Sequence, residues 1–214
     1  VKRISEVTSL LVYFNRNQLS SIPKEVGAMH NVRFFYAENN PLSHLPDAFT
    51  KMKALEGIYF GHCRFTQIPP FVFTMTKLKK LQFSGNQITE LPEAIGNLTE
   101  LRHFNVSDNR IISIPESMAK LTKLRVCDLS DNRFTLLPDA FGAVQIVNQL
   151  RVKNCPITTL PRGFATMRAS IDITGTKIDP ATLPPELRAK IDTEKPPGSK
   201  EWDKIIVKPR RKEK

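Results

Sequence analysis

Apolar and polar residues alternate along most of this chain in a pattern that repeats every 23 residues and closes on an aliphatic residue followed by proline. The eight prolines that close the units are Pro23, Pro46, Pro69, Pro92, Pro115, Pro138, Pro161 and Pro184. Before each of them, apolar residues return at fixed offsets, as at Leu78, Leu81, Phe83 and Ile88 before Leu91. A repeat this regular predicts a stack of equivalent structural units.

Each unit contains two kinds of periodicity. In the segment LxLxxN the apolar positions alternate with polar ones, which is the period of a strand with one buried face. Such strands stack in parallel, roughly 4.8 Å apart. Apolar residues three and six positions after each proline, such as Val72 and Met75, suit a helical turn that packs inward from the opposite side. The chain is therefore expected to form about eight units, with a concave parallel β-sheet and short helical or 3-10 turns on the convex side.

The shared pattern LxxLxLxxNxLxxLP, seen for example from Leu101 to Ile111, resembles the leucine-rich repeat family over residues 1 to about 184. The unit length and the terminal Leu-Pro pair are most similar to intracellular repeats related to Ras-binding scaffolds, a subclass also found in bacterial effectors delivered into host cells. The resemblance implies an α/β repeat solenoid with a horseshoe shape. It also implies a module that binds other proteins.

The asparagine of the pattern and the cysteines have structural explanations. Asparagine stands at Asn17, Asn40, Asn86, Asn109 and Asn132, where its amide can satisfy backbone groups of neighbouring units. Cys63 and Cys155 take the same position, and Cys127 replaces a core leucine. Cysteines so far apart along a solenoid predict neither a metal site nor disulfides. We therefore expect a reducing, cytoplasmic compartment, with delivery into a host cell as the alternative.

The last unit departs from the pattern. Its strand segment, which begins at Ile171, arrives two residues early, and Thr176 replaces the asparagine. Because repeat arrays need polar ends, we expect a terminal unit here. The predicted organisation is a solenoid over residues 1–184, a capping segment over 185–194, and a linker with a basic tail over 195–214.

A search for catalytic chemistry finds no phosphate-binding glycine loop, nucleophile elbow or HExxH motif. The four histidines, His30, His44, His62 and His103, are scattered over four units. An open sheet surface offers no means of excluding water from a reaction. We expect no enzymatic activity, no cofactor, no metal and no small-molecule substrate for this segment, although a larger enzyme could carry it as a recognition arm.

The candidate binding residues are those that face the concave side. The column between the two core residues of each strand holds all three tyrosines in consecutive units, which places their rings side by side. Leu11 and Phe34 flank them, and large rigid aromatic surfaces concentrate binding energy. The predicted partner-binding residues are Leu11, Tyr13, Phe34, Tyr36, Tyr59, His62, Gln82, Asn105, Asp128 and Arg151. The alternative is that the stacked tyrosines stabilise neighbouring strands.

The net charge of +11 leaves a second class of partner open. Basic residues form two columns, Arg33, Lys79, Arg102 and Arg125 at the strand starts, and Arg64, Arg110, Arg133 and Lys177 after the asparagines. Such columns suit an acidic protein, an anionic membrane or a nucleic-acid backbone. A protein partner is favoured because no nucleic-acid recognition motif is present. The sequence gives no oligomeric state.

Overall fold

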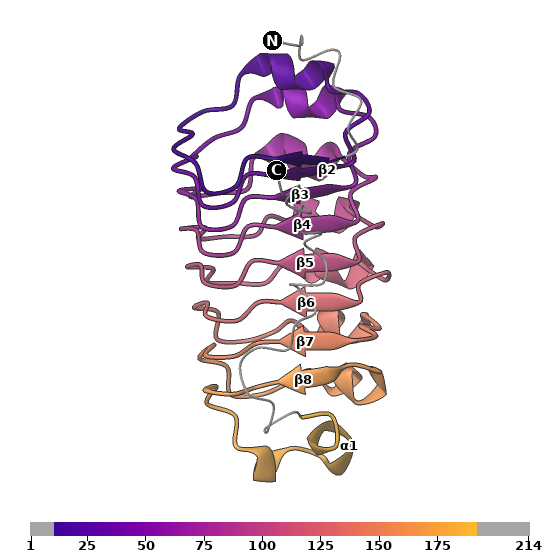
Figure 1. The fold of residues 1–214 in the computed structure, drawn as a ribbon. Helices are drawn as coiled ribbons and strands as arrows, with labels where there is room; N and C mark the ends of the chain where they lie inside the picture. Colours follow the sequence, from indigo (N-terminus) through magenta and orange to yellow (C-terminus); the bar gives the residue numbers. More distant parts are fainter. Residues whose placement is uncertain (1–10, 192–214) are drawn as a thin grey trace, which may run out of the picture.

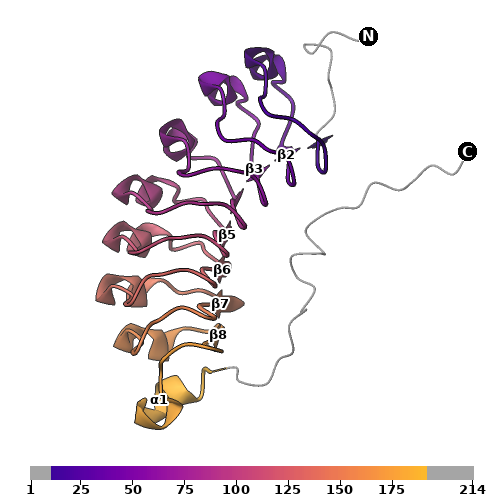
Figure 2. The same cartoon turned by 90° about the vertical axis from the view of Figure 1, so that its left-hand side faces the viewer.

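The structure of the chain is a computed structural model that describes residues 11–191. These residues form a curved solenoid with strands along the inner side of the arc and helical turns along the outer side (Figures 1 and 2). One parallel sheet contains eight strands in chain order. They are β1 Leu11–Tyr13, β2 Phe34–Tyr36, β3 Gly57–Tyr59, β4 Lys80–Gln82, β5 His103–Asn105, β6 Val126–Asp128, β7 Gln149–Arg151 and β8 Ser170–Asp172. The predicted solenoid of about eight units is confirmed.

The register of the sheet follows the repeat. Tyr13 pairs with Tyr36, 23 residues later, and this offset holds as far as β7. In the last pair Arg151 lies opposite Asp172, two residues earlier than the repeat would place it. The early arrival of the last strand is therefore confirmed.

The convex side consists of 3-10 helices, each of which begins after the proline of its unit. They are η2 Lys24–Ala28, η3 Asp47–Lys51, η4 Pro70–Thr74, η5 Glu93–Asn97, η6 Glu116–Lys120, η7 Asp139–Ala143 and η8 Arg162–Thr166. The proline holds an extended conformation, and its carbonyl accepts the first bond of the turn, as from Val26 N to Pro23 O at 3.1 Å. Since proline fixes its own φ and needs no donor at this position, it starts each turn at the same place.

The asparagine column connects neighbouring units. The amide nitrogen of Asn86 donates to Phe60 O at 2.8 Å and Phe83 O at 3.0 Å, and its oxygen accepts from Phe65 N at 3.0 Å. Asn40, Asn109 and Asn132 repeat this arrangement. Cys63 and Cys155 donate to the equivalent carbonyl oxygens, at 3.5 and 3.3 Å. The predicted structural role of this column is confirmed.

The convex helices do not pack equally closely. Glycines allow close approach at three pairs: Gly27 lies against Ala48, Gly96 against Ser117, and Gly142 against Gly163. At the equivalent position η4 carries Phe73, and η4 packs less closely against its neighbours than η5 packs against η6. The convex helices are accordingly spaced more widely on either side of η4, the third helix from the N-terminal end of the arc in Figure 2.

The C-terminal end of the described chain turns back to the sheet. After η9 Pro180–Thr182, the helix α1 Pro185–Arg188 buries Leu187, and Ile191 forms a parallel bridge with Ile171 of β8. The predicted cap over 185–194 falls partly outside the described residues, and the predicted linker and basic tail over 195–214 fall wholly outside them. Across residues 11–191, no helix has the length and apolar character needed to cross a bilayer.

Candidate functional site

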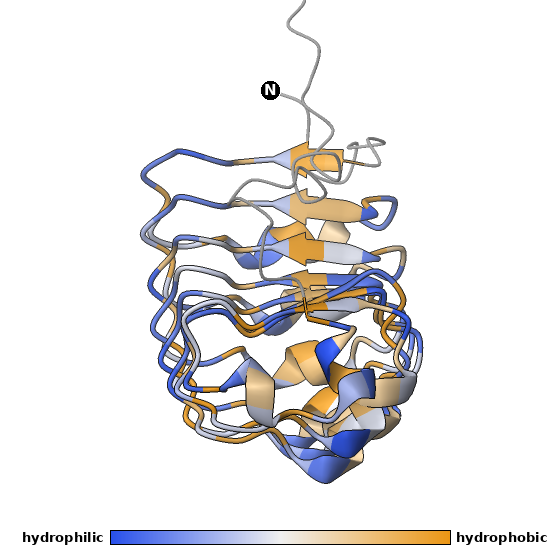
Figure 3. Cartoon of the chain, turned by 90° about the horizontal axis from the view of Figure 1, so that it is seen from below, coloured by the Kyte–Doolittle hydropathy of each residue, from blue (hydrophilic) through white to orange (hydrophobic). Residues whose placement is uncertain are grey.

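The concave face is the candidate site because the helical turns all lie on the other side of the sheet (Figure 2). The middle residue of each strand is buried in the core, as Phe35 and Ile58 are, so the first and third residues face the concave side. Figure 3 shows that the strands are more hydrophobic than many of the connecting loops. Three columns of side chains therefore define this face: the first and third residue of each strand, and the residue two positions further on.

The three tyrosines stack as predicted. The ring centroids of Tyr13 and Tyr36 are 4.6 Å apart with an interplanar angle of 9°, and those of Tyr36 and Tyr59 are 4.2 Å apart with an angle of 15°. Two of these candidate binding residues are nevertheless almost fully buried, since Tyr36 is 2% and Tyr59 1% exposed. Rings at the strand spacing cover one another's faces. Burial raises the pKa of Tyr36 to about 12 and also raises the pKa of Tyr59.

Phe34 lies beside this stack and remains half-buried. Its strand neighbour is Gly57, which leaves the space that the ring occupies. The guanidinium of Arg33 is 5.7 Å and the Lys80 ammonium 5.6 Å from the ring centroid. These distances suit cation–π contacts, so Phe34 joins the apolar end of the face to a positively charged region.

Glu38 is a buried carboxylate in the third column that the sequence did not single out. Asn15 Nδ2 donates to its Oε2 at 3.0 Å, and Gln82 Nε2 donates to its Oε1 at 2.8 Å. Glu38 is only 7% exposed, and this burial raises the pKa of its carboxyl group. The available signal was the single acid in a column that otherwise holds Asn15, Gly61, Ser84, Ser107, Ser130, Lys153 and Thr174.

Predicted site residues His62 and Gln82 lie around Glu38. Gln82 is half-buried and donates to the carboxylate, whereas His62 is exposed and has a φ of 52°. The charge of His62 acts to lower the pKa of Glu38, against the larger effect of burial. His62 and Gln82 are therefore neighbours of one carboxylate, that of Glu38, which the sequence did not single out.

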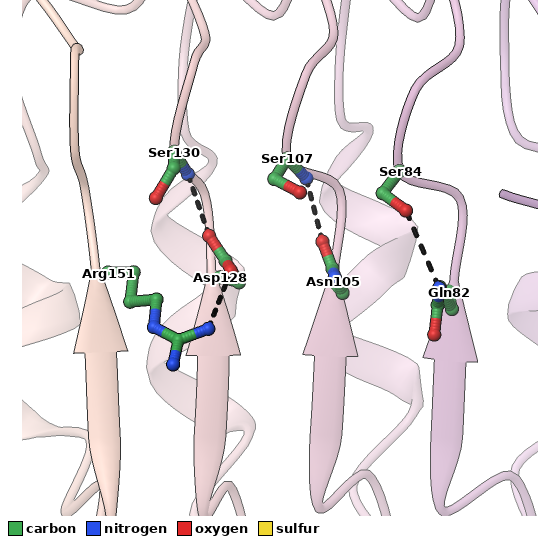
Figure 4. A network of polar contacts seen from close by, with 7 residues as sticks. All are labelled: Gln82, Ser84, Asn105, Ser107, Asp128, Ser130 and Arg151. Carbon is green, nitrogen blue, oxygen red and sulfur yellow. Dashed lines mark hydrogen bonds and ion pairs between the residues drawn. The ribbon is translucent and has the colours of Figure 1, made fainter. Parts of the chain in front are cut away.

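The next strands carry a separate polar network, shown in Figure 4. Ser107 N donates to Asn105 Oδ1 at 2.9 Å, Ser130 N donates to Asp128 Oδ1 at 3.1 Å, and Arg151 Nη1 lies 3.4 Å from Asp128 Oδ2. Asn105 and Asp128, which are also candidate binding residues, are only 6% and 7% exposed. Their side chains hold the turn that follows the strand, which leaves little of them for a partner.

At the start of the strands, the basic column is partly neutralised by acids. Glu56 Oε1 lies 2.8 Å from Arg33 Nη2, and its Oε2 lies 3.0 Å from Lys79 Nζ. The hydrogen bond from Arg33 holds the pKa of Glu56 below its ordinary value. Further along, burial and then the charges of Lys80, Arg125 and Arg102 lower the pKa of His103 to about 4. Positive charge therefore accumulates around β5.

The predicted site residues divide into three groups. Leu11, Tyr13, Phe34, Tyr36 and Tyr59 lie together on β1–β3. His62 and Gln82 surround Glu38, and Asn105, Asp128 and Arg151 form the network of β5–β7. In residues 11–191 no group of three metal-binding side chains is present, and Cys63, Cys127 and Cys155 are buried free thiols.

Comparison with known proteins identifies the repeats. Residues 55–111 match a family model described as leucine rich repeat, and residues 123–144 match a second model of the same description. No curated protein matches the sequence. The subgroup expected from the Leu-Pro pairs stays a prediction.

Solved structures with similar folds come from bacteria and a plant. A leucine-rich repeat protein of Leptospira interrogans has a TM-score of 0.73 at 21% identity, and the match covers 80% of this chain and 50% of that one. An internalin (inlF) of Listeria monocytogenes gives 0.67 at 20%, covering 79% and 47%. The ectodomain of the Arabidopsis thaliana receptor kinase GASSHO1/SCHENGEN3, in complex with Casparian strip integrity factor 2, gives 0.73 at 21%, covering 84% and 23%. In each case the match spans half of the other chain or less.

Proposed function

Because the chain belongs to the leucine-rich repeat family, a typical source of protein-interaction modules, we propose that it binds a partner protein along its concave face. The observation that supports this proposal is a sheet with one face uncovered by any described element (Figure 2). That face carries the half-buried Leu11, Tyr13 and Phe34 and the exposed His62. An apolar cluster beside polar groups has the composition of a binding surface with a polar rim.

Within the proposed surface the residues have different tasks. Leu11, Tyr13 and Phe34 supply accessible apolar area, while Tyr36 and Tyr59 form a rigid support beneath the partner. Gln82 and Arg151, both half-buried, can orient polar groups of the partner. Asn105 and Asp128 contribute mainly by fixing the turns after β5 and β6.

Site-specific photocrosslinking tests the proposal. Phe34 and Phe71 are both half-buried phenylalanines, but Phe34 lies on the concave sheet and Phe71 lies in η4 on the convex side. Each is replaced in turn by benzoylphenylalanine, which keeps an aromatic side chain, and the chain is irradiated in lysate. We expect a discrete crosslinked protein from position 34 only. Equal products from both positions, or a product from position 71 alone, would reject the concave face.

The finer role depends on the length of the natural protein. The match spans between 23% and 50% of the similar solved structures, one of which is the ectodomain of a receptor kinase. A scaffold, adaptor or targeting module acts alone, whereas a recognition arm belongs to a larger enzyme or effector. An antibody raised against residues 11–191 distinguishes the two on an immunoblot. A band near 24.3 kDa favours the free module, and a much larger band favours the arm.

We also propose that the chain works in a reducing compartment. Its three cysteines are buried, and two of them donate hydrogen bonds within the asparagine column. Burial raises the pKa of each thiol, which disfavours the reactive thiolate. Labelling of all three thiols in denatured protein isolated without reductant is the expected result, and blocked thiols would contradict it.

A further inference from the structure

Three cations gather where β4, β5 and β6 begin. Lys80 is the first residue of β4, and Arg102 and Arg125 directly precede β5 and β6. Arg102 N donates to Lys79 O and Arg125 N donates to Arg102 O, both at 2.8 Å, so Arg102 and Arg125 follow Lys79 on successive rungs of the sheet. Lys80 lies one residue further along, opposite His103. Rungs lie roughly 4.8 Å apart, and the charges of all three cations lower the pKa of His103, so Lys80, Arg102 and Arg125 form a short row around that residue.

This row lacks the neutralising acids found next to it. Arg33 and Lys79 share Glu56, and Lys123 pairs with Glu100. Among residues 11–191 no carboxylate forms an ion pair with Lys80, Arg102 or Arg125. Glu100 also feels the charge of Arg102, but it is paired with Lys123, so the row keeps a net positive charge on a partly exposed edge of the concave face.

Two neighbouring features extend the positive region. His103, half-buried between these cations, is held neutral by burial and by their charges. A hollow of about 390 Å³ adjoins the row and is lined by Arg33, Lys53, Lys77 and Lys79 together with Glu56 and Glu100. An anion placed along this edge would therefore meet more positive than negative groups in total, since four cations and two carboxylates line the hollow.

We propose that this edge, formed by Lys80, Arg102, Arg125 and the adjoining hollow, docks an extended acidic segment of the partner protein. The inference rests on the proposed function and specifies the chemistry of the partner. Alternate residues of an extended segment are about 6.6 Å apart, a spacing that lets successive carboxylates reach neighbouring rungs. Charge complementarity of this kind sets the orientation of a partner and speeds its association.

A nucleic acid fits the same surface less well. Asp108 and Asp131 are exposed just beyond the strands, and they would repel a broad phosphate backbone. Single-stranded nucleic acid also gains affinity by stacking its bases on open aromatic rings. Of the three stacked tyrosines only Tyr13 keeps exposed surface, and the half-buried Phe34 ring is flanked by Arg33 and Lys80, so a row of open rings is lacking among residues 11–191. These features favour a narrow acidic peptide.

Fluorescence anisotropy with a labelled (Glu-Ser)6 peptide tests the proposal. The test variant is K80Q/R102Q/R125Q, and the matched control is R64Q/R110Q/R133Q, which removes three exposed cations of the other basic column. We expect about tenfold weaker binding for the test variant and less than about twofold for the control. In a proton NMR titration, the pKa of His103 should rise from about 4 when the peptide binds.

Several results would overturn the proposal. Equal losses in the two triple variants would mean that only net charge matters. Tighter binding of an oligo-dT strand, or of vesicles containing phosphatidylserine, at the same ionic strength would assign the edge to nucleic acid or membrane. The double variant R102Q/R125Q keeps the contact between Lys80 and the Phe34 ring. It should reproduce most of the loss of peptide binding while circular dichroism shows that it is folded, and unchanged binding by this folded variant would contradict the proposal. If the peptide fails to bind while position 34 still crosslinks a protein, this inference fails and the proposed function stands.

Discussion

Gly57 lies directly beneath the ring of Phe34, so that a methyl group at residue 57 would come within 2.7 Å of the ring's Cδ1 atom. The two residues are register partners on β2 and β3. The space that a side chain at residue 57 would occupy is therefore filled by the ring of Phe34, from the unit before it. This packing also sets the ring between Arg33 and Lys80.

The first prediction concerns this pair. Gly57→Ala should displace the Phe34 ring and weaken both cation–π contacts, which lowers the free energy of unfolding by about 1 kcal/mol. In a Phe34→Ala background the same substitution should instead stabilise by about 0.5 kcal/mol, since alanine replaces a flexible glycine in a strand. Urea denaturation of the four proteins measures the coupling. Additive effects would show that the ring and residue 57 do not interact.

The second prediction separates the ring of Tyr59 from its hydroxyl. The hydroxyl is buried without a well-formed hydrogen bond among residues 11–191, the Tyr36 hydroxyl being the group that interacts with it, whereas the ring stacks on Tyr36. Tyr59→Phe should leave stability unchanged or raise it by up to about 1 kcal/mol, because an unsatisfied buried group costs free energy. Tyr59→Ala should cost about 3–5 kcal/mol through lost packing. Thermal unfolding checks both, and a large loss in Tyr59→Phe would reveal a missed partner for the hydroxyl.

The third prediction concerns the asparagine column at Cys63. Its sulfur donates to Ala37 O, and the backbone N–H of Leu42 faces it where an asparagine oxygen would accept a stronger bond. Cys63→Asn should therefore stabilise the chain by about 1 kcal/mol. The control is Cys127→Asn, which places an amide in the core and should destabilise by about 2–4 kcal/mol. A loss of stability in Cys63→Asn would mean that this turn has adapted to sulfur.

The fold could be predicted from the sequence because the 23-residue repeat fixes which residues of neighbouring units lie opposite one another. The 23-residue offset predicts the register of β1 to β7, and the two-residue shift before Ile171 predicts the changed register of β8. It was also sufficient for the tyrosine stack, since equivalent positions in consecutive units must lie side by side.

Exposure on the concave face was harder to predict because it depends on neighbours that differ from unit to unit. A column assignment states that Tyr36 faces the concave side, but not that two rings cover it. In the same way, Asp128 faces the concave side, yet the turn at Ser130 and the side chain of Arg151 engage it.

The last prediction concerns pH. Burial raises the pKa of Glu38 above its ordinary value, so near that pKa the folded state binds a proton more tightly than the unfolded state does. Stability contributed by this group is therefore present at acidic pH and falls as pH rises through the raised pKa. Glu38→Gln should remove this fall, because the glutamine amide does not titrate. Gln82 can turn its own amide and keep a hydrogen bond to the new side chain. Urea midpoints measured from pH 4 to pH 7 should decline more steeply for the wild-type chain than for Glu38→Gln. Parallel curves would show that Glu38 titrates normally and that its hydrogen bonds from Asn15 and Gln82 offset the cost of burial.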